Sequence, residues 1–143
     1  MTITVVVADD SDMIRLGVRT LLETELDIEV VGETGNGPEA SSLVDRFKPD
    51  VLVLAMMLPG LHGLDVLKAV RIHSPDTRAI MFSMHDDPAY LVEALRSGAA
   101  GYVLKQGDPA ELVIAIRLVL AGQTYLSPFS PRSGPRSSSN SAK

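Results

Sequence analysis

Several short apolar runs of the chain end in side chains that could together hold a metal ion and a phosphoryl group. Asp9 and Asp10 follow the first of these runs, Ser83 ends another, and Lys105 follows the last. Two adjacent carboxylates repel each other, so a cation should compensate their charge. Hard oxygen ligands of this kind suit Mg²⁺, which leaves coordination positions for phosphate. An ammonium and a hydroxyl could then hold the phosphoryl group.

Each of these residues has a simpler interpretation when it is taken alone. An isolated Asp10 is more often a helix cap than a metal ligand. Lys105 alone is a solvated lysine in a loop, and Ser83 alone is a hydroxyl at a strand end. Their joint position at the ends of apolar runs favours a shared site, provided that the fold brings those ends together.

The order of strands and helices along the chain predicts that the fold brings the ends of these runs together. Five apolar runs rich in β-branched residues alternate with five segments of helical spacing. The runs are 3–8, 28–31, 51–55, 79–83 and 101–104, and the helical segments are 11–25, 38–47, 62–73, 87–97 and 108–121. This alternation predicts an α/β fold, a doubly wound parallel sheet with helices on both faces. In such sheets ligands bind beyond the carboxyl ends of the strands.

The helix boundaries carry specific sequence signals. Asp-Pro pairs at 87–88 and 108–109 place an N-cap acceptor before a proline that suits the first helical position. Glu111 stands where a capping box needs an acidic residue. Gly98 and Gly122 follow the last periodic residues of two helices, which is typical of C-terminal caps.

Composition limits the class of protein. The chain has 143 residues, 45% of them hydrophobic and 22% charged, as in one soluble globular domain. It has no cysteine, which excludes disulfide frameworks and thiolate sites. It has no long apolar span and no basic signal-peptide start, so we expect a cytoplasmic protein. Nucleotide-binding glycine motifs are absent, and His62, His73 and His85 lack metal-ligand spacing.

Charge and composition divide the chain near residue 126. All 18 acidic residues but only 10 of the 13 basic ones lie in 1–126, which argues against a surface that follows nucleic-acid phosphates. Residues 127–143 contain seven serines and three prolines, a composition that cannot bury enough apolar area to order itself. We therefore expect a domain over 1–126 and a disordered linker or cloning remnant over 127–143. A basic nucleic-acid arm is the alternative for this tail.

Several segments, in the right order, resemble those of one protein family. They are VADD at 7–10, PDVLVL at 49–54 with MLPG at 57–60, SMHDD at 83–87, GYVLK at 101–105 and AGQTYLSP at 121–128. The chain thus resembles the receiver (CheY-like) domain of two-component response regulators, over residues 2–126. The last segments resemble the NarL/FixJ branch, whose receivers precede a LuxR-type helix-turn-helix. The resemblance implies a flavodoxin-like sheet of five strands, in the order 2-1-3-4-5, with five helices.

The resemblance also implies a mechanism, in which a histidine kinase donates a phosphoryl group to an aspartate after the third strand. In this chain that position is Ala55, whose methyl group cannot attack phosphorus. Asp9 and Asp10 match the family's acidic pair, with Asp10 as the direct Mg²⁺ ligand and the backbone carbonyl of Met57 as another. We expect Mg²⁺ binding to be weak or absent with Ala55. Family members catalyse their own phosphorylation, and this chain should not.

The remaining matches belong to the family's conformational switch. Ser83 matches the hydroxyl that turns toward the bound phosphoryl group, and Lys105 matches the lysine that pairs with it. Tyr102 matches the aromatic residue that rotates inward. The alternative for Tyr102 is a half-buried ring whose hydroxyl lies in water.

Three functions remain open. Because the acidic pair, Ser83 and Lys105 are all present, we favour a deliberate Asp-to-Ala replacement in an otherwise competent signalling receiver. The alternatives are a natural atypical receiver that acts as a phosphorylation-independent interaction module, and a small metal-dependent phosphohydrolase. The expected partners are a sensor histidine kinase, a second copy through the apolar helix 108–121, and DNA only through a missing C-terminal domain. We expect no membrane partner.

Overall fold

One sheet of six parallel strands, in the order β2-β1-β3-β4-β5-β6, organises the computed structural model, which describes residues 2–128. The strands are β1 (Ile3–Ala8), β2 (Ile28–Thr34), β3 (Val51–Leu54), β4 (Arg78–Ser83), β5 (Gly101–Leu104) and β6 (Tyr125–Leu126). The helices are α1 (Asp12–Leu22), α2 (Gly37–Phe47), α3 (Gly63–His73), α4 (Pro88–Arg96) and α5 (Ala110–Leu120). The predicted doubly wound α/β fold with five helices is confirmed.

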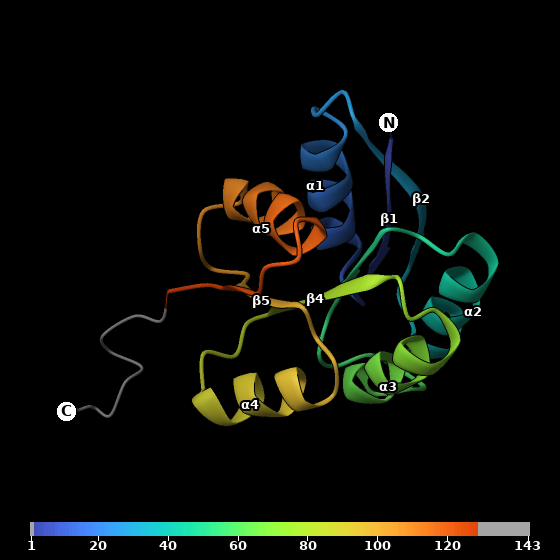
Figure 1. Ribbon diagram of the computed structural model, residues 1–143, viewed down its shortest axis with the longest axis vertical. Coiled ribbons are helices and arrows are strands. Elements are labelled where there is room, and N and C mark those ends of the chain that lie inside the picture. The colour runs from blue at the N-terminus through green and yellow to red at the C-terminus, as the bar shows by residue number, and fades with distance from the viewer. Residues whose placement is uncertain (1, 129–143) are drawn as a thin grey trace.

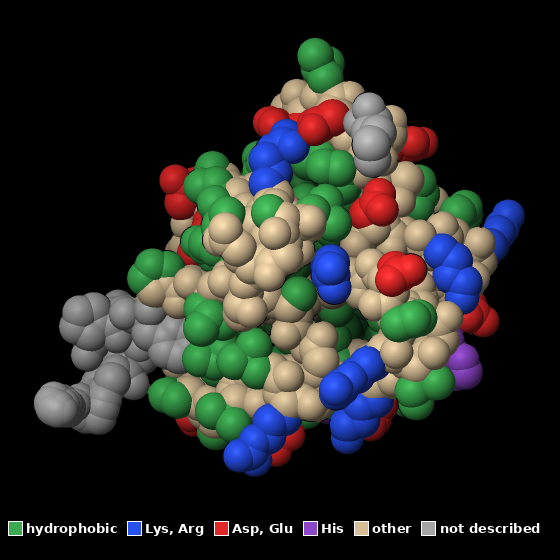
Figure 2. Space-filling model, in the orientation of Figure 1, with side chains coloured by type: hydrophobic (Ala, Val, Ile, Leu, Met, Phe, Trp, Pro, Cys, Tyr) green, Lys and Arg blue, Asp and Glu red, His purple; other side chains and the backbone are tan. Residues whose placement is uncertain are grey.

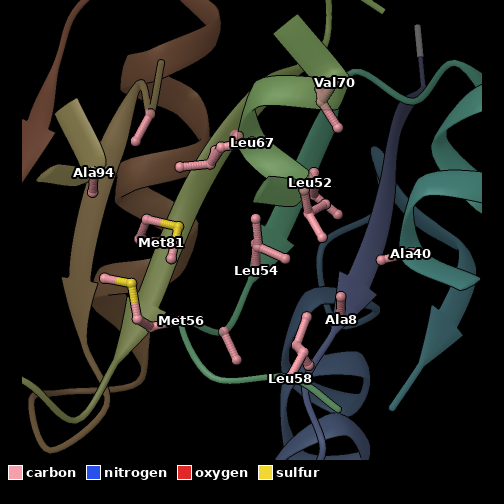
Figure 3. Close-up of a cluster of buried hydrophobic side chains, with 14 of the residues drawn as sticks. Ala8, Ala40, Leu52, Leu54, Met56, Leu58, Leu67, Val70, Met81 and Ala94 are labelled. Carbon is pink, nitrogen blue, oxygen red and sulfur yellow. The ribbon is translucent and has the colours of Figure 1, made fainter. Parts of the chain in front are cut away.

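The helices cover both faces of the sheet. Figure 1 shows α1 and α5 on one face and α2, α3 and α4 on the other. Successive residues of β3 serve opposite faces: Leu52 and Leu54 join the core under α2, α3 and α4 (Figure 3), while Val51 and Val53 join the core under α1 and α5. Burial on both faces explains why the strands read as continuous apolar runs.

The prediction of five strands was one strand short. Tyr125 and Leu126 form β6 beside Gly101 and Tyr102 of β5. A strand of two residues is too short to produce a periodic signal, so the pattern of apolar residues could not reveal it. Its position depends on contacts with Glu111, which the prediction assigned to a capping box; the Glu111 carboxylate accepts hydrogen bonds from the Tyr125 and Ser127 hydroxyls instead.

Most of the other boundary signals act as expected. The Asp87 carboxylate accepts a hydrogen bond from the Ala89 amide at 2.9 Å and caps α4. Gly98 and Gly122 have φ of +109° and +89°, the left-handed conformation of C-terminal caps. Asp108 also accepts from a backbone amide near the start of α5, although the helix begins at Ala110.

The predicted domain boundary, between residues 126 and 127, falls within the described residues. Ser127, the first residue of the predicted tail, is buried, and its amide donates to the Tyr102 carbonyl at 2.9 Å. The rest of that prediction, from residue 129 onward, lies outside the described residues. Among residues 2–128 there is no helix with the length and apolar character that crossing a membrane would require.

Candidate functional site

The carboxyl ends of four neighbouring strands bring the predicted site residues to one edge of the sheet. β1, β3, β4 and β5 are adjacent and parallel, so the residues that follow them lie at the same end. Backbone hydrogen bonds hold the positions in register: the Ala55 amide donates to the Ala8 carbonyl, and the Lys105 amide donates to the Ser83 carbonyl, both at 2.8 Å. Residue 55 therefore lies between the end of β1 and the end of β4.

A buried ion pair spans this edge. The Lys105 ammonium lies 2.5 Å from a carboxylate oxygen of Asp9, and their side chains are only 11% and 2% exposed. The two residues follow β1 and β5, which are separated in the sheet by β3 and β4. The contact thus shows that side chains from distant parts of the sequence meet above the ends of the intervening strands.

The start of α1 fixes the Asp9 side chain and the turn that follows it. The second carboxylate oxygen of Asp9 accepts a hydrogen bond from the Ser11 amide at 3.0 Å, and the Ser11 hydroxyl caps the helix at Ile14. Arg15 donates to the Asp9 backbone carbonyl at 2.5 Å and also forms an ion pair with Asp12. Sequence reasoning missed Arg15, whose signal was a basic residue one turn into a helix that begins beside two acids.

Asp10 and Met57 lie on an open groove beside this ion pair. The Asp10 side chain is exposed, and the groove, of about 500 Å³, runs along the loop from Met57 to His62. The loop closes tightly on α3, because the Gly63 amide donates to the Met56 carbonyl at 2.8 Å. A Cβ atom at Gly63 would lie 2.4 Å from the Ala55 carbonyl oxygen, so only glycine permits this approach.

Ala55 leaves the predicted metal site incomplete. Its side chain is 4% exposed and belongs to the apolar core. Of the hard oxygen donors expected around Mg²⁺, the Asp9 carboxylate is already neutralised by Lys105 and the methyl of Ala55 supplies none. Within residues 2–128 no group of three or more histidine, aspartate or glutamate side chains could hold a metal. Ala55 thus supplies no oxygen donor to the predicted site, where Asp10 and the Met57 carbonyl are the donors that could remain.

Ser83, the last residue of β4, lies next to Tyr102 of the neighbouring strand β5. Both are buried, and the Ser83 hydroxyl accepts a hydrogen bond from the His85 amide at 3.0 Å. The Tyr102 hydroxyl donates to the His85 carbonyl at 2.7 Å. Burial raises the pKa of the Tyr102 phenol, and a hydrogen bond with Ser83 acts in the opposite direction. The alternative of a half-buried ring with its hydroxyl in water is therefore wrong; the ring is fully buried.

The three histidines serve separate local purposes. His62 caps α3, where its Nδ1 atom accepts from the Leu64 amide at 3.1 Å. His73 lies in the last turn of the same helix. The His85 ring stacks on Tyr90 with their centroids 4.4 Å apart.

The apolar residues of α5 divide between core and surface. Leu112, Ala115, Ile116 and Val119 are buried, so most of the surface assigned to a second copy packs inside the domain. Figure 2 shows hydrophobic side chains gathered between α4 and α5. The exposed large hydrophobic residues of α4, α5 and β6 are Tyr90, Val92, Leu95, Ile114 and Leu126. The homodimer contact stays a prediction.

Known proteins with this sequence pattern and fold are consistent with the geometry. Residues 5–117 match the family model described as "Response regulator receiver domain". The chain is 39% identical to the oxygen regulatory protein NreC of Staphylococcus epidermidis. The 123 aligned residues cover 85% of this chain and 56% of that protein. The chain spans about half the length of the curated relatives it matches.

Solved structures show the same similarity. A two-component response regulator of the LuxR family from an Aurantimonas species is 37% identical and superposes with a TM-score of 0.85, over 90% of this chain and 91% of that chain. The receiver domain of the response regulator NarL from Mycobacterium tuberculosis is 38% identical with a TM-score of 0.82, over 85% of this chain and 98% of that chain. The family match over residues 5–117 includes all of the predicted site residues, from Asp9 to Lys105.

Proposed function

The chain belongs to the response regulator receiver domain family, and we propose that it is the receiver of a two-component transcription regulator whose phosphoryl acceptor position is occupied by alanine. In receivers the acceptor aspartate follows the third strand. In this chain the residue after β3 is Ala55, at the centre of the edge that carries the other matching residues. A methyl group has no lone pair for attack on phosphorus, so the chain stays unphosphorylated and has no enzymatic turnover.

The observation that carries this proposal is the contact between Asp9 and Lys105 across two intervening strands. It supports a single site at this edge of the sheet, because the two side chains meet above the ends of β3 and β4, and residue 55 directly follows β3. The Ser83 hydroxyl lies at the end of the neighbouring strand β4. An aspartate at position 55 would therefore meet an ammonium, a hydroxyl and two carboxylates, which is the set that phosphoryl transfer requires.

Metal binding in the present chain is expected to be weak or absent. Asp10 and the Met57 carbonyl line one groove and could offer oxygen donors there. The third carboxylate that would complete such a set is missing at Ala55. Deliberate replacement of the acceptor explains why the remaining residues are all suited to the chemistry that this chain lacks.

The partners follow from the family. The phosphoryl donor would be the phosphohistidine of a sensor kinase. A DNA-binding half would follow the receiver, because the chain spans about half the length of its curated relatives and is similar to LuxR-family response regulators. We propose that the protein functions in the cytoplasm.

A second candidate is an atypical receiver that works as an interaction module without phosphorylation. The observation in its favour is that Lys105 already neutralises Asp9, so the pocket is balanced without an acceptor or a metal. In this alternative the alanine is natural, and the protein functions by binding a partner through the surface between α4 and α5.

Restoring the acceptor separates the two candidates. The Ala55→Asp protein is incubated with Mg²⁺ and acetyl phosphate, and intact-mass spectrometry follows the gain of one phosphoryl group. The matched control is Ala55→Asn, which has nearly the same volume and no nucleophilic carboxylate. Stable stoichiometric labelling of the aspartate variant alone supports the signalling receiver.

The other outcomes contradict that proposal. No labelling of either variant favours the interaction module. Continuous release of phosphate without accumulation of labelled protein would indicate a phosphohydrolase, the third hypothesis from the sequence.

A further inference from the structure

The segment that leaves the domain is attached to β5 by side chains as well as by backbone. The Tyr125 amide donates to the Ala100 carbonyl at 3.3 Å, and the Ser127 amide donates to the Tyr102 carbonyl at 2.9 Å. The backbone pairing then stops, because β6 ends at Leu126. The amide of Leu104, the last residue of β5, donates instead to the Ser127 hydroxyl at 2.9 Å.

This last hydrogen bond gives Ser127 a specific role. Both Leu104 and Ser127 are buried, and the Leu104 amide has its partner in the serine hydroxyl. A buried amide without a partner costs about 1–3 kcal/mol. An alanine at position 127 would therefore leave the Leu104 amide, one residue before Lys105, without this acceptor.

Glu111 orients the serine hydroxyl. The same carboxylate oxygen of Glu111 accepts two hydrogen bonds. One comes from the Ser127 hydroxyl at 2.8 Å and the other from the Tyr125 hydroxyl at 2.7 Å. Because Ser127 donates its hydroxyl proton to Glu111, its oxygen lone pairs are directed to the Leu104 amide. The carboxylate thus holds two side chains of the outgoing segment at once, through charge-assisted hydrogen bonds.

We propose that Glu111, Tyr125 and Ser127 form a clasp that fixes the outgoing segment to β5, beside Tyr102 and Lys105. The clasp fixes the course of the chain as far as Pro128, the last described residue. It also connects this segment to the strand that carries the site: Ser127 contacts the backbone of Tyr102 and Leu104, and the next residue is Lys105. That a DNA-binding half is positioned in this way rests on the proposed function; the clasp itself does not.

Amide hydrogen exchange, followed residue by residue by NMR in the full chain with Ala55, tests the clasp. Glu111→Ala should accelerate exchange of the Leu104 and Ser127 amides by about tenfold or more, the loss expected for a charge-assisted hydrogen bond. Glu111→Gln keeps an oxygen acceptor and should restore most of the protection. The control is Glu93→Ala, at an exposed position on α4, which should change neither amide.

A second variant makes the test independent of α5. Ser127→Ala should accelerate exchange at Leu104 while β1 and β3 keep their protection, and Ser42→Ala on the exposed side of α2 is its control. Unchanged exchange at Leu104 and Ser127 in both Glu111→Ala and Ser127→Ala would overturn the clasp.

The connection to the site is tested in Ala55→Asp protein treated with Mg²⁺ and acetyl phosphate. Altered exchange at Ser127 on phosphorylation supports a clasp that responds to the site, whereas unchanged exchange in fully labelled protein overturns that role. Failure to label contradicts the proposed function instead, and leaves the clasp to be judged by the exchange of the Glu111 and Ser127 variants.

Discussion

Asp9 and Lys105 form the pair on which the charge balance of the site depends. A carboxylate as deeply buried as Asp9 is costly unless a cation and hydrogen-bond donors compensate it. Lys105 supplies the cation, and the Ser11 amide supplies a donor. In this chain the Lys105 ammonium therefore neutralises the charge of Asp9, which a bound cation would otherwise have to neutralise.

Removing the lysine should be costly. Lys105→Met leaves Asp9 as an uncompensated buried charge, and we expect the free energy of unfolding to fall by about 3 kcal/mol, as measured by urea denaturation. Lys68→Met, at an exposed position on α3, is the control and should change stability by less than about 0.5 kcal/mol. An equally small effect at both positions would contradict a buried, paired Asp9.

Restoring the acceptor should also lower stability in the absence of metal. Ala55→Asp adds a third carboxylate beside Asp9 and Asp10 at a position that is 4% exposed. Repulsion and burial should reduce the free energy of unfolding by about 1 kcal/mol, and Mg²⁺ should recover it. Thermal unfolding with and without Mg²⁺ measures both changes. The idea of converging carboxylates fails if stability and Mg²⁺ response equal those of Ala55→Asn.

Tyr125 should titrate at unusually high pH. Burial and the hydrogen bond to Glu111 raise the pKa of its phenol to about 12. Because the folded state favours the neutral phenol, the stabilisation is present below the ordinary tyrosine pKa of about 10 and is lost as the pH rises toward 12. An absorbance titration that follows tyrosinate formation measures this pKa. The transition at the highest pH should be absent from the Tyr125→Phe variant. A normal titration of Tyr125 would contradict its contact with Glu111.

At the scale of elements, the sequence was informative wherever a run was long enough to show its period. The five longer strands, the five helices and the cap at Asp87 were predictable, because each depends on local pattern and local chemistry. The sixth strand was not, because two residues are too few to show a period and one of them, Tyr125, is held by the Glu111 carboxylate of α5. The same contact explains why Glu111 does not complete a capping box.

The junction between β3 and α3 is the element boundary on which the site depends most. Gly63→Ala would place Cβ against the Ala55 and Met56 carbonyl oxygens, so we expect the free energy of unfolding to fall by about 2 kcal/mol. Gly17→Ala on α1 is the matched control, because no atom lies within 4 Å of the added Cβ. It should raise stability by about 0.5–1 kcal/mol, since alanine is the better helix former. Equal effects in denaturation experiments would contradict the tight junction.

At the scale of the whole molecule, the topology turns residues from separate segments into one site. Motif resemblance named Asp9, Ser83 and Lys105, and the rule that ligands bind at strand carboxyl ends placed them on one edge. The choice of Asp9 as the lysine's partner was not predictable, because it depends on side-chain conformations above two other strands. Arg15 was missed for the same reason: its contact with the Asp9 carbonyl depends on the turn into α1.

The central claim is that this site lacks only its acceptor, and the location of a transferred phosphoryl group tests it most directly. Ala55→Asp protein labelled with acetyl phosphate and Mg²⁺ is reduced with borohydride, which converts an acyl phosphate to an alcohol, and the modified residue is found by peptide mass spectrometry. We expect modification at position 55 alone. Modification of Asp9, Asp10 or Ser83 in its place, or of no residue, would contradict it.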